Sequence, residues 1–519
     1  MENALSDSLA TLRQYPLLAK DQQAAWRSRV QSSTLIWPAE ARELLESLSR
    51  EESAFDATLD APLAVLLGLL RTPQGAPARP WDAPLLDAAT DVMSRLARTP
   101  QARFALLHAL VQSDDPAVLG RWATLLERLL PIGAKEVDAS LAPLFQRRTY
   151  DPSAIFPALL ESLRHPSLAT GVLDLANYLY RSGRCGRHPA AERIEQSAQL
   201  LGAVAQRLQQ LDEAPASDGA EHAKALEVYQ TSVALVIALC DALALIGNPS
   251  VVGKLNQVLE LRHRRLRAEA ACALARLGDK HGVEQLVALT REPVVRSRAL
   301  AYLDEVGALD QAPPEARTSA ARGEGDLAAW LAAPEQFGIA PQRMELIESR
   351  RQYWPGFDEQ VDCHLFRFEY ALPQGEFSGV GLAGPTAHAL GVDLLDYPPG
   401  DIFATYCGWQ AEHAELSETD ARDVTAGERA TADRYARRLV EEGYHDVRLV
   451  KVAHFFGDQH FVFEADRGDA EQPQPGVVVV DGGEPYWYPQ PRASNPPGER
   501  ELYWLHRGRK LLAYFNASK

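Results

Sequence analysis

The spacing of apolar residues changes once along this 519-residue chain. Up to about residue 355, apolar residues recur every three or four positions, as in 116–130 and 191–211, which is the spacing of amphipathic helices. Asp115 followed by Pro116 is a typical helix start. Strand-like alternation is absent before about 355. The pattern therefore predicts an all-helical first part followed by a part that contains strands.

The second part combines strand signals with one clear helix. Residues 361–372 alternate between apolar and polar, 476–482 reads as a buried strand, and 447–466 as a hairpin around Gly457. We also expect a closing hairpin through Gly508 within 501–515. Residues 425–443 predict a helix that ends at a glycine. The second part is therefore expected to be a mainly antiparallel α+β domain.

An internal repeat is visible between residues 238 and 307. The segment 238–259 aligns with 269–289, and its first half recurs at 298–309. In each copy a helix is predicted to end at a glycine, namely Gly247, Gly278 and Gly307. Glycine suits this position because a residue that ends a helix commonly has a positive φ angle. These repeats resemble the HEAT-like repeat family in a short form. The resemblance implies that helix pairs stack into an α-solenoid.

The domain organisation follows from these patterns. We predict a multidomain chain with an all-α HEAT-like helical repeat solenoid at 1–310 and a mainly antiparallel α+β domain at 355–519. A linker and connecting helix at 311–354 join them, because 311–326 is rich in proline, alanine and glycine.

The negative charge of the chain is concentrated in the second part. The formal net charge is −17, of which residues 334–519 carry −12 with 18 basic and 30 acidic residues. The same residues contain 25 of the 40 aromatic side chains. An acidic surface with aromatic side chains favours association with a basic protein.

Composition also bears on the cellular location. The N-terminus lacks a basic segment followed by an apolar one, and no uninterrupted run of about 20 apolar residues occurs. Five cysteines are scattered with no C-x-x-C pair, which disfavours a disulfide framework and a thiolate zinc site. We therefore expect a cytoplasmic protein without membrane contact.

Sequence motifs for catalysis are incomplete. Gly379, Gly381 and Gly384 match G-x-G-x-x-G, but Pro385 follows at once, so a glycine-rich turn or bulged strand is the better interpretation. His413 and Glu415 match half of a zinc deaminase motif whose cysteine half is missing. We expect no cofactor, no metal, no small-molecule ligand and no catalytic residues. An enzyme with a motif-free site in the C-terminal domain stays an open alternative.

Two segments combine aromatic with acidic residues and are candidates for partner binding. In one of them Trp409 precedes several carboxylates, and in the other three aromatic residues are consecutive. Aromatic side chains supply buried anchors at interfaces, and carboxylates steer a basic partner. The alternative is ordinary core packing and a solvated acidic surface. The candidate residues are Trp409, Glu412, Glu415, Asp420, Tyr486, Trp487 and Tyr488.

A second resemblance gives the partner a chemical class. Residues 366–385 followed by 401–409 resemble C-terminal regions of large bacterial immunity proteins, which neutralise secreted toxins. The resemblance implies that the chain binds and occludes a basic toxin domain. A HEAT-repeat nucleic-acid-binding protein is the alternative, because basic residues gather at 181–188 and 262–267. The acidic net charge opposes it.

Overall fold

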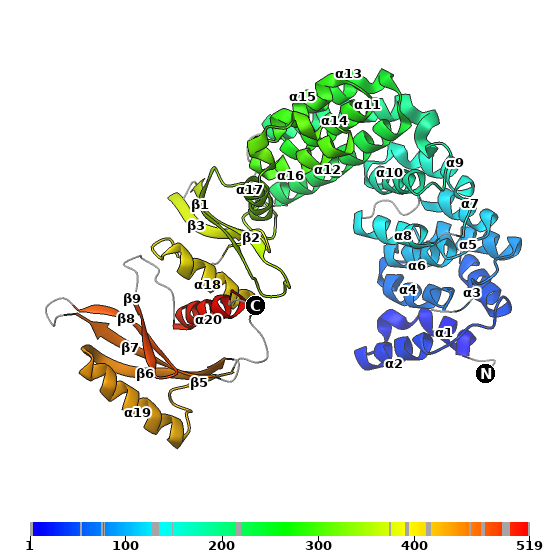
Figure 1. Ribbon diagram of the computed structural model, residues 1–519. Coiled ribbons are helices and arrows are strands. Elements are labelled where there is room, and N and C mark those ends of the chain that lie inside the picture. The colour runs from blue at the N-terminus through cyan, green and yellow to red at the C-terminus, as the bar shows by residue number, and fades with distance from the viewer. Residues whose placement is uncertain are drawn as a thin grey trace. The chain divides into compact units, whose positions relative to one another are not determined.

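The computed structural model describes residues 4–516, except for 52–53, 74–75, 77, 127–133, 148, 214–219, 373–374, 390–393, 412–416, 456–457, 469–472 and 490–498. The chain divides into two compact units, Met1–Gln285 and Leu286–Lys519. Figure 1 shows helices in the first unit, and helices together with strands in the second.

The described residues of the first unit form helices, short 3-10 turns and connecting loops. The helices are α1 (Ala4–Leu12), α2 (Lys20–Gln31), α3 (Ala39–Ser49), α4 (Asp60–Gly68), α5 (Ala83–Arg95), α6 (Pro100–Val111), α7 (Pro116–Leu125), α8 (Ala134–Gln146), α9 (Phe156–Leu159), α10 (Pro166–Arg181), α11 (Ile194–Glu213), α12 (Ala220–Ile246), α13 (Val252–Leu259) and α14 (Arg264–Arg276). Helix α15 (Lys280–Leu289) contains the boundary between the units. As predicted, no strand occurs at 230–305, all of which the structure describes.

Helices of the first unit pack mainly on the next but one in the sequence. Helices α2, α4, α6, α8, α10, α12 and α14 form one such series of contacts, and α1, α3, α5, α7 and α9 form another. The predicted helix ends are confirmed, because Gly247, Gly278 and Gly307 have φ angles of 76°, 81° and 68°. Gly183 behaves in the same way with a φ of 71°. One continuous cluster of buried leucine, alanine and valine side chains links these helices.

Helix α12 is long and apolar. Among the described residues, its stretch 223–246 is the one helix that could cross a membrane by length and composition, and half of that stretch is buried within the protein. It packs on α10, α11 and α14. Within it, Asp241 forms ion pairs with Arg181 and Arg276. These contacts are those of a core helix.

The second unit contains helices and two antiparallel sheets. Its helices are α16 (Pro293–Glu305), α17 (Ser319–Leu331), α18 (Pro399–Gln410), α19 (Ala426–Glu441) and α20 (Glu499–Phe515). Its strands are β1 (Arg343–Gln352), β2 (Val361–Leu372), β3 (Gly375–Ala383), β4 (His388–Ala389), β5 (Ser417–Asp420), β6 (Tyr444–Phe455), β7 (Asp458–Arg467), β8 (Gln474–Asp481) and β9 (Glu484–Pro489). A helical part followed by an antiparallel α+β part is the predicted order.

The two sheets are stacked with helices in layers (Figure 1). Sheet A has the strand order β1-β2-β3-β4, and sheet B has the order β5-β6-β7-β8-β9. Helix α17 packs on one face of sheet A. Helices α18 and α20 pack on the other face of sheet A and also on sheet B. Helix α19 covers the remaining face of sheet B. The pair α18 and α20 is therefore the shared centre of this unit.

The predicted hairpin at 501–515 is wrong, because these residues belong to α20. Gly508 does not form a turn. It lies where α20 crosses α18, and a Cβ atom there would overlap the carbonyl group of Ala404. Gly408 on α18 faces α20 at the same crossing, close to the carbonyl of Trp504. Both glycines permit close helix packing, which a sequence pattern cannot distinguish from turn formation.

Two further boundaries differ from the prediction. Strand β1 starts at Arg343, although no strand is predicted before 355, because most of its side chains are exposed and do not alternate strictly. The linker-like residues 311–326 include the first half of α17, whose start is capped by the Thr318 hydroxyl. Its glycines, Gly323 and Gly325, pack against the His364 ring and the Pro293 carbonyl.

Candidate functional site

The structure does not bring the predicted partner-binding residues into one patch. Asp420 lies on β5, whereas Tyr486, Trp487 and Tyr488 lie on β9, at the opposite edge of sheet B. Trp409 is at the end of α18. The carboxylates at positions 412 and 415, Glu412 and Glu415, lie outside the described residues.

The two predicted tryptophan anchors are half-buried within the second unit. The Trp409 ring packs edge-on against His388, with ring centroids 4.5 Å apart. The Trp487 ring packs against Tyr444 at 5.5 Å and lies over Gly476. Both rings therefore already have internal partners.

The remaining predicted residues differ in exposure. Tyr488 is 2% exposed and belongs to the core beneath α20, because successive side chains of β9 point to opposite faces of the sheet. Tyr486 points to the same face nearer the edge and is 42% exposed. Asp420 is exposed and bonded to Arg422 in an ion pair of 3.0 Å. Among the predicted residues that the structure describes, Tyr486 and Asp420 thus offer the most surface.

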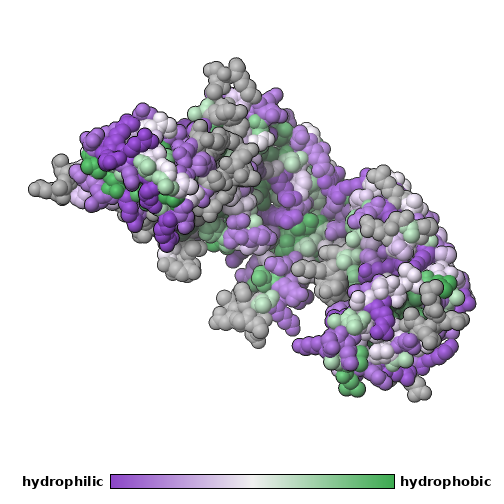
Figure 2. Space-filling model, turned by 90° about the horizontal axis from the view of Figure 1, so that it is seen from below, coloured by the Kyte–Doolittle hydropathy of each residue, from purple (hydrophilic) through white to green (hydrophobic). Residues whose placement is uncertain are grey.

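An aromatic patch that the sequence did not point to lies on sheet A. We call Phe337, Phe368, Tyr370 and Phe377 the sheet A aromatic patch. The Phe337 ring stacks on Tyr370 at 4.8 Å and touches Phe377 at 5.5 Å. Phe337 and Phe377 are nevertheless 43% and 42% exposed, and the neighbouring Ile339 is also exposed. In Figure 2 most of the visible face is hydrophilic, with hydrophobic residues in smaller areas between.

A buried group of ligand-type side chains lies between sheet B and α20. His460 on β7 and Asp481 at the end of β8 are direct partners in the strand register, so both point to the α20 side. His506 comes from α20. His460 Nδ1 lies 3.6 Å from Asp481 Oδ1, and His506 Nε2 lies 3.7 Å from Asp481 Oδ2. Among the described residues, these three could hold a metal ion.

The surroundings of this histidine–aspartate cluster fix its geometry and charge. The Tyr488 hydroxyl and His506 Nδ1 are 3.0 Å apart, and the Lys510 ammonium lies 3.4 Å from Asp481. The contact with His506 lowers the pKa of Asp481 to about 2, assisted by His460 and Lys510 and opposed by partial burial. The carboxylate is therefore ionised at neutral pH.

No local sequence signal could have identified this cluster. Its members are separated by 21 and 25 residues and lie on three different elements. The hairpin predicted at 501–515 includes His506, whereas the structure places this residue on α20. A helix prediction for 501–515 would have placed His506 and Lys510 on one face, because they are four residues apart.

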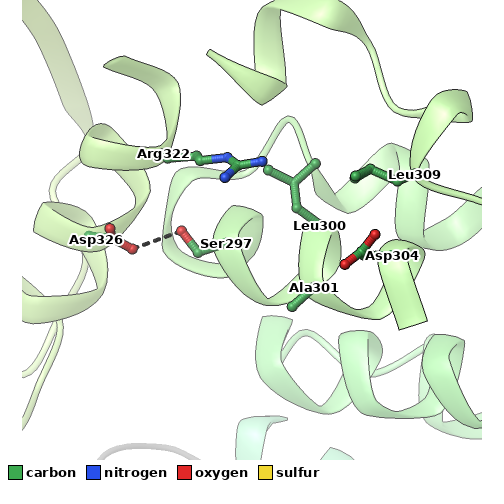
Figure 3. Close-up of a pocket in the computed structure, with 7 residues that line it drawn as sticks. All are labelled: Ser297, Leu300, Ala301, Asp304, Leu309, Arg322 and Asp326. Atoms are coloured by element: carbon green, nitrogen blue, oxygen red, sulfur yellow. Dashed lines mark hydrogen bonds between the residues drawn. The ribbon is translucent and has the colours of Figure 1, made fainter. Parts of the chain in front are cut away.

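A cavity of about 290 Å³ lies beside α16 and α17 (Figure 3). Its lining includes the Ser297 hydroxyl, which donates a 2.8 Å hydrogen bond to Asp326. Among the residues that the structure describes, no histidine or cysteine lines it. The lining residues are Ser297, Leu300, Ala301, Asp304, Leu309, Arg322 and Asp326.

The basic islands of the first unit are largely neutralised within the protein. Arg181 pairs with Asp241, Arg187 pairs with Glu192, and Arg265 lies 3.8 Å from Glu269. Arg184 donates hydrogen bonds to the backbone carbonyls of Arg147 and Tyr150. Arg184 is thus held by backbone contacts, whereas the side chains of Arg187 and Arg265 stay more than half exposed in their ion pairs.

The two cysteines of the second unit, Cys363 and Cys407, are poor nucleophiles. Cys407 is fully buried in the core beside sheet A, and burial raises the pKa of its thiol well above the ordinary value. Burial likewise raises the pKa of Cys363 to about 12. Because the thiolate is the reactive form, neither side chain is activated for catalysis.

Neither a scan against protein-family models nor a search of curated proteins finds a match to this chain.

Proposed function

We propose that this chain is a non-enzymatic binding protein whose partner is a basic protein. In this proposal it acts as a bacterial immunity protein that occludes a toxin domain in the cytoplasm. The helical unit is a HEAT-like solenoid that serves as a scaffold, and the α+β unit supplies a contact surface. The two series of next-but-one helix contacts, α1 to α9 and α2 to α14, and the positive φ angles of the repeat glycines support the solenoid.

The observation that carries the proposal is the sheet A aromatic patch. Large aromatic rings in contact with water are unfavourable by roughly 25 cal/mol for each Å² of apolar area. Such rings are also the side chains most enriched among the energetic centres of interfaces. Phe337 and Phe377 retain more than 40% of their area exposed while packed on a rigid sheet. A partner that covers them would bind pre-ordered side chains.

Charge supports a basic partner. Residues 334–519 carry a net charge of −12. An acidic surface accelerates association with a positively charged protein and disfavours the binding of nucleic acid, which is negatively charged. Arg181 and Arg187 pair with carboxylates and Arg184 with a backbone carbonyl, which also disfavours nucleic-acid binding because these side chains already have internal partners.

The proposal is tested by capture followed by kinetics. The tagged full-length protein is exposed to lysate of its native host, and retained proteins are identified by mass spectrometry and compared with neighbouring reading frames. A basic protein from an adjacent reading frame is the expected result. Retention of RNA or DNA alone, released by salt and dependent on Arg264 and Arg265, would instead support the nucleic-acid alternative. Turnover of a small molecule with no retained protein would support the enzyme alternative.

Binding kinetics then locate the contact surface. We expect association to slow by at least about tenfold between 0.05 and 0.5 M salt, because the Debye length shortens. Phe377→Ala is expected to raise the dissociation rate by about 10- to 100-fold, as for an interface anchor. Val440→Ala is the control, because Val440 is an apolar residue on α19 that is 56% exposed, somewhat more than Phe377. Equal effects of the two variants would refute the patch as the contact surface.

A further inference from the structure

Two buried imidazoles and a carboxylate from three elements converge at one point of the second unit. The ligand atoms of His460, Asp481 and His506 all lie within 4.8 Å of one another. Ligands at about 2.0–2.1 Å in a tetrahedral zinc site lie roughly 3.4 Å apart. The separations of 3.6 Å from His460 Nδ1 to Asp481 Oδ1 and 3.7 Å from His506 Nε2 to Asp481 Oδ2 are close to this value. No pair of ligand atoms in the cluster is more than 4.8 Å apart, so a bound ion would draw the three side chains together by at most about 1.4 Å.

Burial makes this arrangement unlike a surface group of charges. His460 is 0% exposed and His506 is 4% exposed. The two rings are 5.0 Å apart and inclined at 70°, so they do not stack and their nitrogens can face a common centre. His506 Nε2 has no hydrogen-bond partner among the described residues, and it points towards Asp481.

Tyr488 explains the orientation of the His506 ring. Its hydroxyl lies 3.0 Å from His506 Nδ1. A proton on Nδ1 can therefore be donated to the Tyr488 oxygen, which leaves the Nε2 lone pair directed at the cluster. Metal-binding histidines almost always use their second nitrogen in this way.

We propose that His460, Asp481 and His506 form a binding site for a divalent transition-metal ion of the zinc type, with Tyr488 as the positioning residue for His506. Imidazole ligands select zinc, copper, iron or nickel over magnesium and calcium. Three protein ligands leave a fourth position, on the side where Asp481 is partly exposed. This proposal differs from the prediction made from sequence motifs, which is that the protein binds no metal. It does not depend on the proposed binding function.

Lys510 provides a specific test of the site. Its ammonium lies 3.4 Å from Asp481 Oδ1, and a bound dication would compete with it for the same carboxylate. Removal of this positive charge should therefore strengthen metal binding, whereas a variant that merely loosens the fold should weaken it. A structural ion pair without a metal site would not produce this gain.

The experiment is calorimetric titration of zinc into the chelator-stripped full-length protein. The wild-type protein is expected to bind one equivalent of zinc. The ligand variants Asp481→Asn and His506→Gln should bind zinc at least tenfold more weakly, and Tyr488→Phe about tenfold more weakly. Lys510→Met should bind zinc more tightly than the wild-type protein. His445→Ala, an exposed histidine on β6, is the control and should bind as wild type. Circular dichroism shows that each variant is folded.

Several results would overturn the site. One is the absence of zinc binding to the wild-type protein at 100-fold molar excess. Another is unchanged affinity in the folded Asp481→Asn and His506→Gln variants. Loss of binding in His413→Ala but not in His506→Gln would place the ion at the incomplete deaminase-type motif instead.

Discussion

At the scale of single residues, His188 shows how a buried titratable group stabilises the helical unit. Its Nε2 lies 3.0 Å from the Asn177 side-chain oxygen, and its Nδ1 accepts a hydrogen bond from the Ala190 backbone N–H. Asn177 in turn donates to the Ala238 carbonyl on α12. A neutral imidazole with a proton on Nε2 satisfies this whole network. Burial, together with the nearby Arg181 and against the attraction of Asp241, lowers the pKa of His188 to about 4.

We therefore predict that acidification weakens the helical unit through His188. The unfolded chain binds a proton below pH about 6.5, whereas the folded protein does so only below about 4. The stabilisation is complete above pH 6.5 and is lost as the pH falls towards 4, by up to about 3 kcal/mol. Urea unfolding at pH 7.5 and 4.5 measures it. His188→Gln should lose less stability between these values than wild type, and the exposed His281→Gln should match wild type. Equal pH dependence in all three proteins would contradict the prediction.

At the scale of elements, the crossing of α18 and α20 is the closest helix contact of the second unit. Gly408 and Gly508 face each other's helices there, and a Cβ atom at Gly508 would overlap the Ala404 backbone. The crossing also carries an ion pair between Asp401 on α18 and Arg509 on α20. It positions His506 and Lys510 over sheet B. The geometry of the proposed metal site thus depends on two glycines that touch none of its ligands.

Gly508→Ala is predicted to destabilise the second unit strongly. The added methyl group meets backbone atoms that cannot rotate away, so the two helices must separate, at a cost of more than about 3 kcal/mol. Gly427→Ala on α19 is the matched control, because a Cβ atom there meets nothing within 4 Å. Alanine should be neutral or stabilising by up to about 1 kcal/mol at that position. Urea unfolding compares the two variants, and similar midpoints would show that the helices can separate freely.

The sequence predicts the role of a glycine at a helix end, but not the role of a glycine that permits close packing between elements. Gly247 and Gly443 were placed correctly at helix ends, because a periodic helix precedes each of them and both have positive φ angles. Gly508 and Gly323 were misassigned, because close packing against another element leaves no local pattern. The alternating strands β2, β6, β7 and β8 could be predicted because each has one or both faces buried. Strand β1 is mostly exposed and gives no such signal.

The same limit applies to the functional residues. Aromatic residues that are consecutive in sequence, such as Trp487 and Tyr488, were grouped together, although a strand directs them to opposite faces of sheet B. The histidine–aspartate cluster and the sheet A aromatic patch are formed by residues distant in sequence. The register of the strands and the crossing of the helices bring these residues together in space. The spacing of residues along the sequence predicts neither the register nor the crossing.

At the scale of the whole molecule, each of the two compact units contains hydrophobic clusters of its own. The buried cluster of the helical unit extends from Leu12 to Leu274. The second unit has buried clusters on both sides of each sheet, from Leu327 onwards, and buried apolar side chains such as Leu289 and Leu303 on α15 and α16. Since cooperative unfolding follows the extent of a continuous core, each unit is expected to unfold as its own cooperative transition.

Calorimetry of the full-length protein should therefore show two unfolding transitions. Lowering the pH from 7.5 to 5 should shift the transition of the helical unit more in wild type than in His188→Gln, because that histidine titrates in the first unit. Gly508→Ala should lower only the other transition, because its clash lies between α18 and α20. Zinc at saturating concentration should raise that same transition through binding to the folded form, and Asp481→Asn should abolish the rise. A single transition that responds to every one of these changes would show that the two cores unfold together, and that the division at Gln285 has no thermodynamic counterpart.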